Sequence, residues 1–215
     1  MALHYKIIPV TPFQQNCSLI WCSKTMQAAV VDPGGDVARI QAAIAAEGVT
    51  LSKILLTHGH LDHVGGSADL AKAAGVKIIG PQREDAFWID ALGEQCRMFG
   101  FPPVPLFQPD QWLEEGETVS VGEEVLEVIY TPGHTPGHIV FYSRSAQLAL
   151  VGDVLFAGSI GRTDFPRGNH QQLIDSIRLK LWPLGRDVEF IPGHGPMSTL
   201  GEEIDSNPFV AGRAG

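Results

Sequence analysis

The feature that most constrains this chain is the run Thr57-His58-Gly59-His60-Leu61-Asp62-His63, which holds three of its eight histidines and a carboxylate. Neutral imidazole is the commonest metal ligand in proteins. In a short loop, alternate residues can face one ion while their neighbours face a second ion. The run therefore predicts a loop that supplies ligands to a metal centre.

Three further candidate ligands stand in a similar setting, each just after a predicted strand and close to a glycine. They are His134 after residues 125–130, Asp153 after 148–151 and His194 after 188–191, and the histidine-rich run itself follows a predicted strand at 53–56. Four strand ends that converge on one rim would combine imidazoles with a carboxylate able to bridge two ions. Such an open ligand set is typical of a catalytic metal site and not of a closed structural one.

Short apolar runs and helix-forming segments alternate along both halves of the chain. Further strands are predicted at 5–10, 17–22, 28–32, 76–79, 118–121 and 139–142. Helices are predicted at 37–48, 63–74, 84–92, 171–181 and 201–206, with Asp36 as the N-cap of the first helix. Four prolines between 102 and 109 predict an extended connection after residue 92. This order favours two sheets packed face to face with helices outside.

The net charge of −9 and the absence of a basic stripe argue against a nucleic-acid partner, because phosphate binding needs clustered Lys and Arg. We find no leader-like start and no apolar run of the roughly 18 residues that a membrane span needs, so we expect a cytoplasmic protein without a membrane partner. Cys17, Cys22 and Cys96 fit no paired framework, and we expect reduced, buried thiols.

The H-x-H-x-D-H run, followed in order by His134, Asp153 and His194, resembles the metallo-β-lactamase superfamily. Segments 31–34, 57–63, 131–138 and 161–165 resemble its glyoxalase II branch, the hydroxyacylglutathione hydrolases, and the resemblance extends over residues 3–208. It implies an α/β protein with a four-layer αββα sandwich. We expect a single domain over residues 1–215.

The resemblance also implies the ligand sets. His58, His60 and His134 would hold one divalent metal ion, Asp62, His63 and His194 the other, and Asp153 would bridge both. Zinc is the preferred ion, with iron and manganese as alternatives. A metal-bridging hydroxide would attack the thioester of a glutathione-linked substrate, and Asp62 would be the catalytic residue that orients it. The implied reaction converts S-D-lactoylglutathione to D-lactate and glutathione.

Three outer residues have expected roles of their own. Asp32 and His138 are predicted to contact ligands without binding metal, and Arg162 and Asp164 are predicted to form an ion pair.

Two features qualify the resemblance. Only 21 residues follow His194, so we expect the short, single-domain bacterial type without the C-terminal helical domain that grips glutathione. The segment Gly161-Arg162-Thr163-Asp164-Phe165 is also similar to persulfide dioxygenases, which use one iron held by two His and one Asp. Persulfide oxidation is therefore the main alternative. Hydrolysis of lactones or of other substrates, and a non-catalytic binding protein that keeps the metal for structure, are weaker alternatives.

Overall fold

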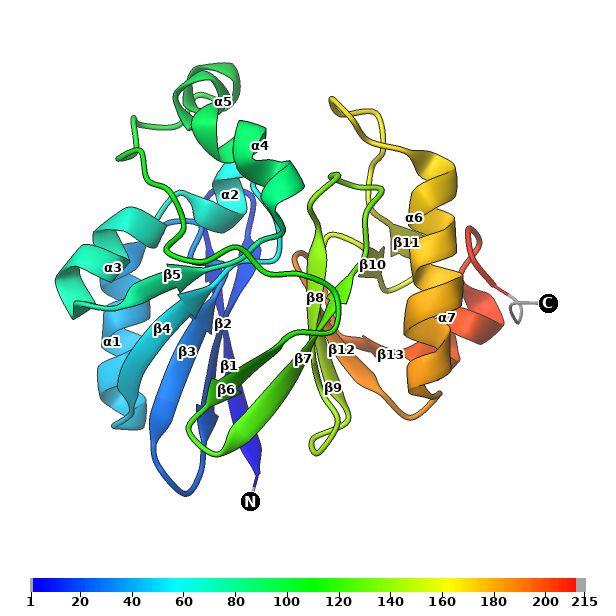
Figure 1. Cartoon of the computed structure of the whole chain (residues 1–215), viewed down its shortest axis with the longest axis horizontal. Helices are drawn as coiled ribbons and strands as arrows, with labels where there is room; N and C mark the ends of the chain where they lie inside the picture. The colour runs from blue at the N-terminus through cyan, green and yellow to red at the C-terminus, as the bar shows by residue number, and fades with distance from the viewer. Residues whose placement is uncertain (1, 212–215) are drawn as a thin grey trace.

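The two predicted sheets are present in the computed structural model, which describes residues 2–211, and they pack face to face with helices on both outer sides (Figure 1). The first sheet has the strand order β1-β2-β3-β4-β5; its first three strands are antiparallel and the last three are parallel. Its strands are β1 (Leu3–Val10), β2 (Gln15–Cys22), β3 (Gln27–Val31), β4 (Thr50–Leu55) and β5 (Lys77–Ile79).

The second sheet has the order β13-β12-β9-β8-β7-β6 and is antiparallel except where β9 and β12 run parallel. Its strands are β6 (Thr118–Val121), β7 (Glu124–Tyr130), β8 (Ile139–Ser143), β9 (Leu148–Gly152), β12 (Glu189–Pro192) and β13 (Ser198–Thr199). A small hairpin follows β9, made by β10 (Leu155–Phe156) and β11 (Ser159–Ile160).

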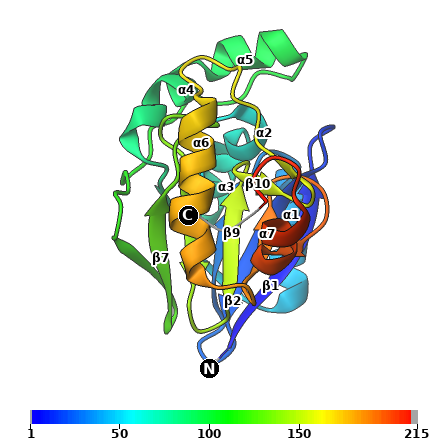
Figure 2. The same cartoon turned by 90° about the vertical axis from the view of Figure 1, so that its right-hand side faces the viewer.

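Helices cover the outer faces and one end of the sandwich. Outside the first sheet lie α1 (Val37–Glu47) and α3 (Ser67–Ala74); outside the second, as Figure 2 shows, lie α6 (His170–Ser176) and α7 (Leu200–Ser206). Helix α6 continues directly into a π-helical turn, η2 (Ile177–Leu181), which is followed by a short 3-10 helix, η3 (Trp182–Leu184). The upper end carries α2 (Leu61–Val64), η1 (Arg83–Asp85), α4 (Ala86–Asp90) and α5 (Leu92–Phe99).

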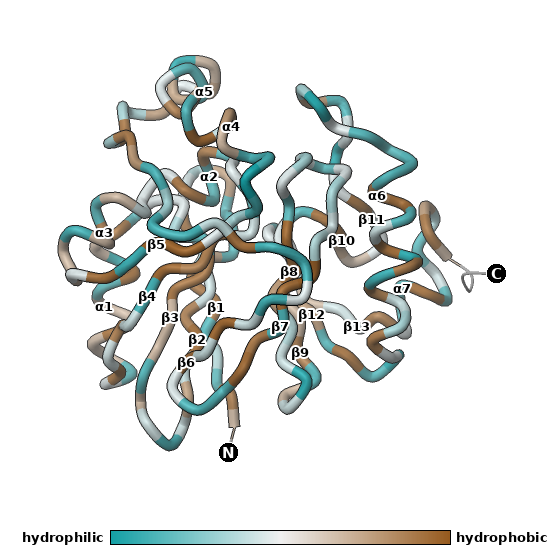
Figure 3. The backbone as a smooth tube through the Cα atoms, in the orientation of Figure 1, coloured by the Kyte–Doolittle hydropathy of each residue, from teal (hydrophilic) through white to brown (hydrophobic). Residues whose placement is uncertain are grey.

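Apolar side chains fill each interface between layers. One cluster joins the two sheets, with Ile20 and Leu55 from the first sheet and Phe141 and Leu150 from the second. Separate clusters bury the helices of each side against their own sheet. Figure 3 shows the apolar segments gathered along the strands. These four layers confirm the αββα sandwich that the resemblance implied.

Two helix predictions were wrong. The predicted helix at 63–74 is two helices, α2 and α3, because Gly65 and Gly66 press against another loop: a Cβ at Gly65 would lie 2.7 Å from the carbonyl oxygen of Gly34. The connection after residue 92 begins with a helix, α5, whose buried Leu92, Gln95 and Cys96 recur at helical spacing before Gly100 ends it. The prolines disfavour helix only beyond that point.

Three smaller expectations had mixed outcomes. Asp36 does occupy the N-cap position of α1, but its carboxylate accepts a hydrogen bond from Thr11 N at 2.8 Å and does not cap the helix.

The three cysteines are free and buried, as expected. Within residues 2–211 no helix has the length and apolar character needed to cross a membrane.

Candidate metal centre

The candidate ligands all follow strands that end at the upper rim of the sandwich. The histidine-rich loop follows β4 of the first sheet and runs into α2. His134 follows β7, Asp153 directly follows β9, and His194 follows β12, all from the second sheet. The rim where the two sheets meet therefore receives side chains from both halves of the chain.

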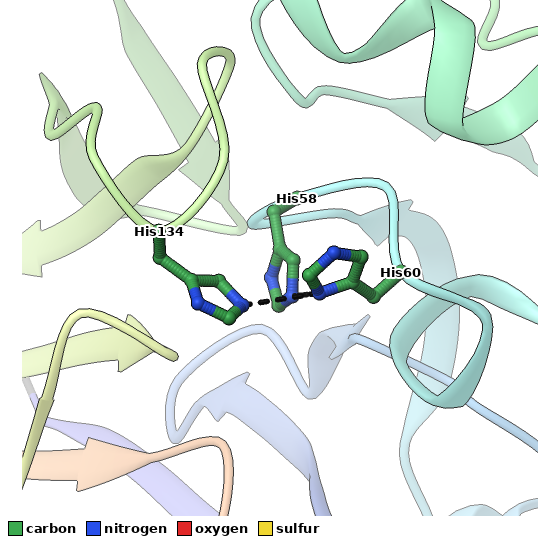
Figure 4. Close-up of side chains that lie close together, drawn as sticks. All are labelled: His58, His60 and His134. Carbon is green, nitrogen blue, oxygen red and sulfur yellow. Dashed lines mark hydrogen bonds between the residues drawn. The ribbon is translucent and has the colours of Figure 1, made fainter. Parts of the chain in front are cut away.

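His58, His60 and His134 form the first group. His60 Nδ1 lies 3.1 Å from His58 Nε2 and 3.0 Å from His134 Nε2, and Figure 4 shows the three imidazoles pointing toward one another. All three side chains are buried, and burial lowers the pKa of each, so the neutral form is favoured. Three neutral nitrogens converging in this way fit a borderline divalent metal ion.

Asp62, His63 and His194 form the second group, whose ligand atoms lie within 4.8 Å of one another. Asp62 Oδ2 is 3.2 Å from His194 Nε2 and 3.8 Å from His63 Nε2. One carboxylate and two imidazoles can hold a second cation beside the first.

Asp153 lies between the two groups. Its Oδ1 is 3.3 Å from His63 Nε2, while its Oδ2 is 3.6 Å from His134 Nε2 and 3.7 Å from His194 Nε2. Burial alone would raise the pKa of Asp153, but the neighbouring His63, His134 and His194 hold it well below its ordinary value. An ionised carboxylate thus faces both ligand groups.

The outer nitrogens of the ligand histidines are fixed by hydrogen bonds. His63 Nδ1 lies 2.9 Å from Asp32 Oδ2, and His134 Nδ1 lies 2.7 Å from the carbonyl oxygen of Arg162. His194 Nδ1 lies 3.2 Å from the carbonyl oxygen of Phe13. An acceptor oxygen at Nδ1 places the proton there and leaves Nε2 as the free ligand atom.

Asp32 and His138 contact the ligands as the sequence predicted. Asp32 also accepts hydrogen bonds from Thr57 N and Thr57 Oγ1, so although it lies close to His58 and His63 its oxygens are already used. His138 Nε2 accepts a hydrogen bond from Asp153 N at 3.1 Å, and its ring stacks on that of His58 at 4.7 Å. The predicted Arg162–Asp164 ion pair is present, with 2.8 Å between Nη2 and Oδ2.

Asp85 is a residue of the centre that sequence reasoning missed. Its fully buried carboxylate accepts hydrogen bonds from Gly59 N at 2.8 Å, Thr135 Oγ1 at 2.8 Å and Gly137 N at 2.6 Å. Gly59 stands between two ligands of the first sheet's loop, and Thr135 follows His134 in the second sheet's loop. One carboxylate therefore ties together the two loops that carry the first ligand group.

The environment of Asp85 is closely packed and unusual for an acid. A Cβ at Gly59 would lie 2.7 Å from Trp88 Cβ, and one at Gly137 would lie 2.4 Å from Asp85 N. The backbones of both loops therefore pack directly on the segment formed by η1 and α4. Burial raises the pKa of Asp85 to about 6, although the hydrogen bonds favour the carboxylate. The only signal in the sequence is the acidic pair Glu84 and Asp85 before an apolar helix, which is also typical of an ordinary helix start.

Polar atoms left without partners show that the two groups fit metal ions. His63 Nε2 and Asp153 Oδ1 are buried and have no hydrogen-bond partner among the described residues. Leaving such atoms unpaired costs about 1–3 kcal/mol each. Both face the space between the groups, where a cation would satisfy them.

A family model described as the metallo-beta-lactamase superfamily matches residues 10–194, which include every one of these ligands. The chain belongs to this superfamily. This superfamily member is 48% identical over 209 residues to the hydroxyacylglutathione hydrolase GloC of Haemophilus influenzae, with 97% of this chain and 98% of that protein covered.

Two solved structures are closely similar to this fold. The B3 metallo-beta-lactamase BLEG-1 has a TM-score of 0.89 at 34% identity, covering 97% of this chain and 100% of that one. TTHA1623, solved in a di-iron-bound form, has a TM-score of 0.86 at 33% identity, covering 95% of this chain and 99% of that one. The fold of this superfamily member is therefore compatible with a centre of two metals.

Proposed function

We propose that this superfamily member is a metal-dependent thioester hydrolase of the glyoxalase II type, which cleaves S-D-lactoylglutathione to D-lactate and glutathione. The observation that carries the proposal is the position of Asp153 between two complete ligand groups. The 48% identity to a hydroxyacylglutathione hydrolase over nearly the whole chain supports the thioester substrate.

In this proposal His58, His60 and His134 hold one divalent ion, Asp62, His63 and His194 hold the other, and Asp153 binds both. Zinc remains the preferred ion, and the di-iron form of TTHA1623 supports iron as a candidate. Both sheets supply ligands, so we treat the sandwich as one catalytic unit. When bound, the two ions lower the pKa of water toward neutrality and polarise a carbonyl group.

Asp62 is the proposed catalytic residue. Its carboxylate lies at the edge of the cavity above the centre, where it can accept a hydrogen bond from the attacking water and fix its direction. The water oxygen bonds to the acyl carbon, the carbon–sulfur bond breaks, and the sulfur takes the proton. Because a thiol has a pKa of about 8–9, the departing sulfur needs little help from an acid.

Metal content tests the two-ion site. Protein purified without chelators should contain about two metal ions per chain, and prolonged dialysis against a strong chelator should remove both, because the chelator competes with the protein ligands for each ion. Elemental analysis measures the ratio, with chelator-free buffer as the control. A stable ratio of one iron per chain, with no uptake of a second ion, would instead support the dioxygenase.

Substrate turnover tests the reaction. The metal-loaded protein should cleave S-D-lactoylglutathione, measured as release of free thiol, and the chelated protein should lose this activity. A parallel reaction with glutathione persulfide should consume no oxygen above the protein-free control. Oxygen consumption without thioester cleavage would identify the protein as a persulfide dioxygenase and refute the hydrolase assignment.

A further inference from the structure

A cavity of about 640 Å3 opens directly above the candidate metal centre. His60, Asp62, His134, Asp153 and His194 form its floor. Its walls come from the loop between β1 and β2, from α4 and α5, and from residues 159–166. A thioester whose carbonyl group reaches the floor therefore contacts these walls.

The wall nearest the floor is aromatic. The ring of Phe165 lies 4.9 Å from that of His60 and 5.9 Å from that of His134, measured between centroids. Trp88 lies 4.5 Å from His60 and meets Phe165 edge to face at 6.1 Å. Phe87 extends the surface beside Trp88. Phe165 is only half-buried; the Arg162 guanidinium covers part of its ring, and the part that stays exposed can contact a ligand.

Farther out, the rim of the cavity exposes more apolar surface. Met98 is 75% exposed, Phe13 45% and Phe99 41%, and all three line the cavity. Single exposed apolar residues are ordinary, but several gathered around one cavity indicate a surface that binds apolar groups. Phe13 and Phe99 already contact each other edge to face at 5.9 Å.

The cavity offers little to a charged group. Among the described residues that line it, Arg162 is the only lysine or arginine. The Arg162 guanidinium already makes two hydrogen bonds to Asp164, at 3.0 and 2.8 Å, and lies over the Phe165 ring. A glutathione moiety carries two carboxylates, so charge pairing cannot supply most of its affinity here.

We propose that this cavity selects thioesters with a bulky apolar acyl group, in particular an aromatic one, over the small lactoyl group. The acyl group packs against the exposed side of the Phe165 ring, beside the Trp88 ring that Phe165 contacts, and the polar thiol moiety extends toward the rim and solvent. This inference rests on the proposed hydrolase function and adds the class of acyl group to it. Phe165 is its main specificity-determining residue.

Two substrates that differ by one phenyl group test the inference. S-(3-phenyllactoyl)glutathione is S-lactoylglutathione with a phenyl group on its methyl carbon. For the metal-loaded protein, kcat/KM should be about tenfold or more higher for the phenyl compound, since burying an aromatic ring is strongly favourable. Equal or lower values for the phenyl compound would overturn the inference and leave the hydrolase assignment intact. Cleavage of neither compound would refute the hydrolase assignment itself.

Variants locate the preference. Phe165→Ala should lower the ratio of the two kcat/KM values about fivefold or more, and Met98→Ala should lower it less, because its side chain lies at the rim. Leu179→Ala is the matched control: it removes a 64% exposed apolar side chain outside the cavity and should leave the ratio unchanged. Metal content is measured for each variant. A ratio unchanged in both Phe165→Ala and Met98→Ala would contradict the assigned wall.

Discussion

Replacement of Asp153 by alanine is expected to remove both metal ions together and to lower kcat/KM for the thioester at least about a thousandfold. One carboxylate faces both ligand groups, with Oδ1 3.3 Å from His63 Nε2 and Oδ2 3.6 Å from His134 Nε2. Without it, each group keeps three ligands, but two cations would face each other with no anion between them. Loss of metal activation corresponds to several kcal/mol of transition-state stabilisation.

Elemental analysis and turnover measured on the same sample provide the test. Asp175→Ala is a suitable control, because Asp175 is an exposed carboxylate on α6 that accepts a hydrogen bond from Gln171 Nε2 at 2.9 Å. This control should retain both ions and full activity. If Asp153→Ala kept two ions per chain, the bridging role would be wrong, whatever happened to turnover.

Replacement of Asp85 by alanine should lower the free energy of unfolding by about 3 kcal/mol above pH 7. The variant leaves three buried donors unpaired, at about 1–3 kcal/mol each. The variant also removes a buried carboxylate whose pKa is raised from 3.8 to about 6. Above pH 6 the loss of this buried charge stabilises the folded variant by about 3 kcal/mol. The unpaired donors dominate this balance.

Denaturant unfolding of the metal-free protein measures this change apart from metal affinity. Asp90→Ala is the matched control, because Asp90 is the last residue of α4, the helix that Asp85 directly precedes. Asp90 is exposed and accepts one hydrogen bond from Gln108. It should change stability by less than about 0.5 kcal/mol. Equal stability of the two variants would show that Asp85 does not hold the loops together.

The metal centre could be anticipated because its signals are local. Each candidate ligand follows an apolar strand, and the strand periodicity is legible from neighbouring residues alone. The strand predicted at 53–56 is observed as β4, Thr50–Leu55, which shifts its limits but not the loop that follows. The division of the ligands into two groups came from the family resemblance, and the structure brings together the ligand atoms of each group; a third set of close atoms, Asp32, His58 and His63, crosses that division.

The features that escaped prediction depend on contacts between distant segments. Asp85 acquires its partners from Gly59 and Gly137, which lie 26 and 52 residues away in the chain. The Gly65-Gly66 pair is a local signal for the break between α2 and α3, but the close approach of the Gly34 carbonyl to Gly65 becomes visible only in the folded chain. Phe165 contacts His60, which comes from a loop of the other half of the chain, so this contact too is invisible in the local sequence.

Because the ligands come from both sheets, bound metal ions would affect the stability of the folded chain as well as its activity. The loop after β4 belongs to one sheet, while His134, Asp153 and His194 belong to the other. Ions bound at this rim thus act as cross-links between two halves that otherwise associate through apolar packing. By mass action, an ion that binds only the folded chain adds about RT ln(1 + [L]/Kd) to its stability. Scarcity of metal would therefore reduce how much of this protein stays folded, as well as how fast it turns over.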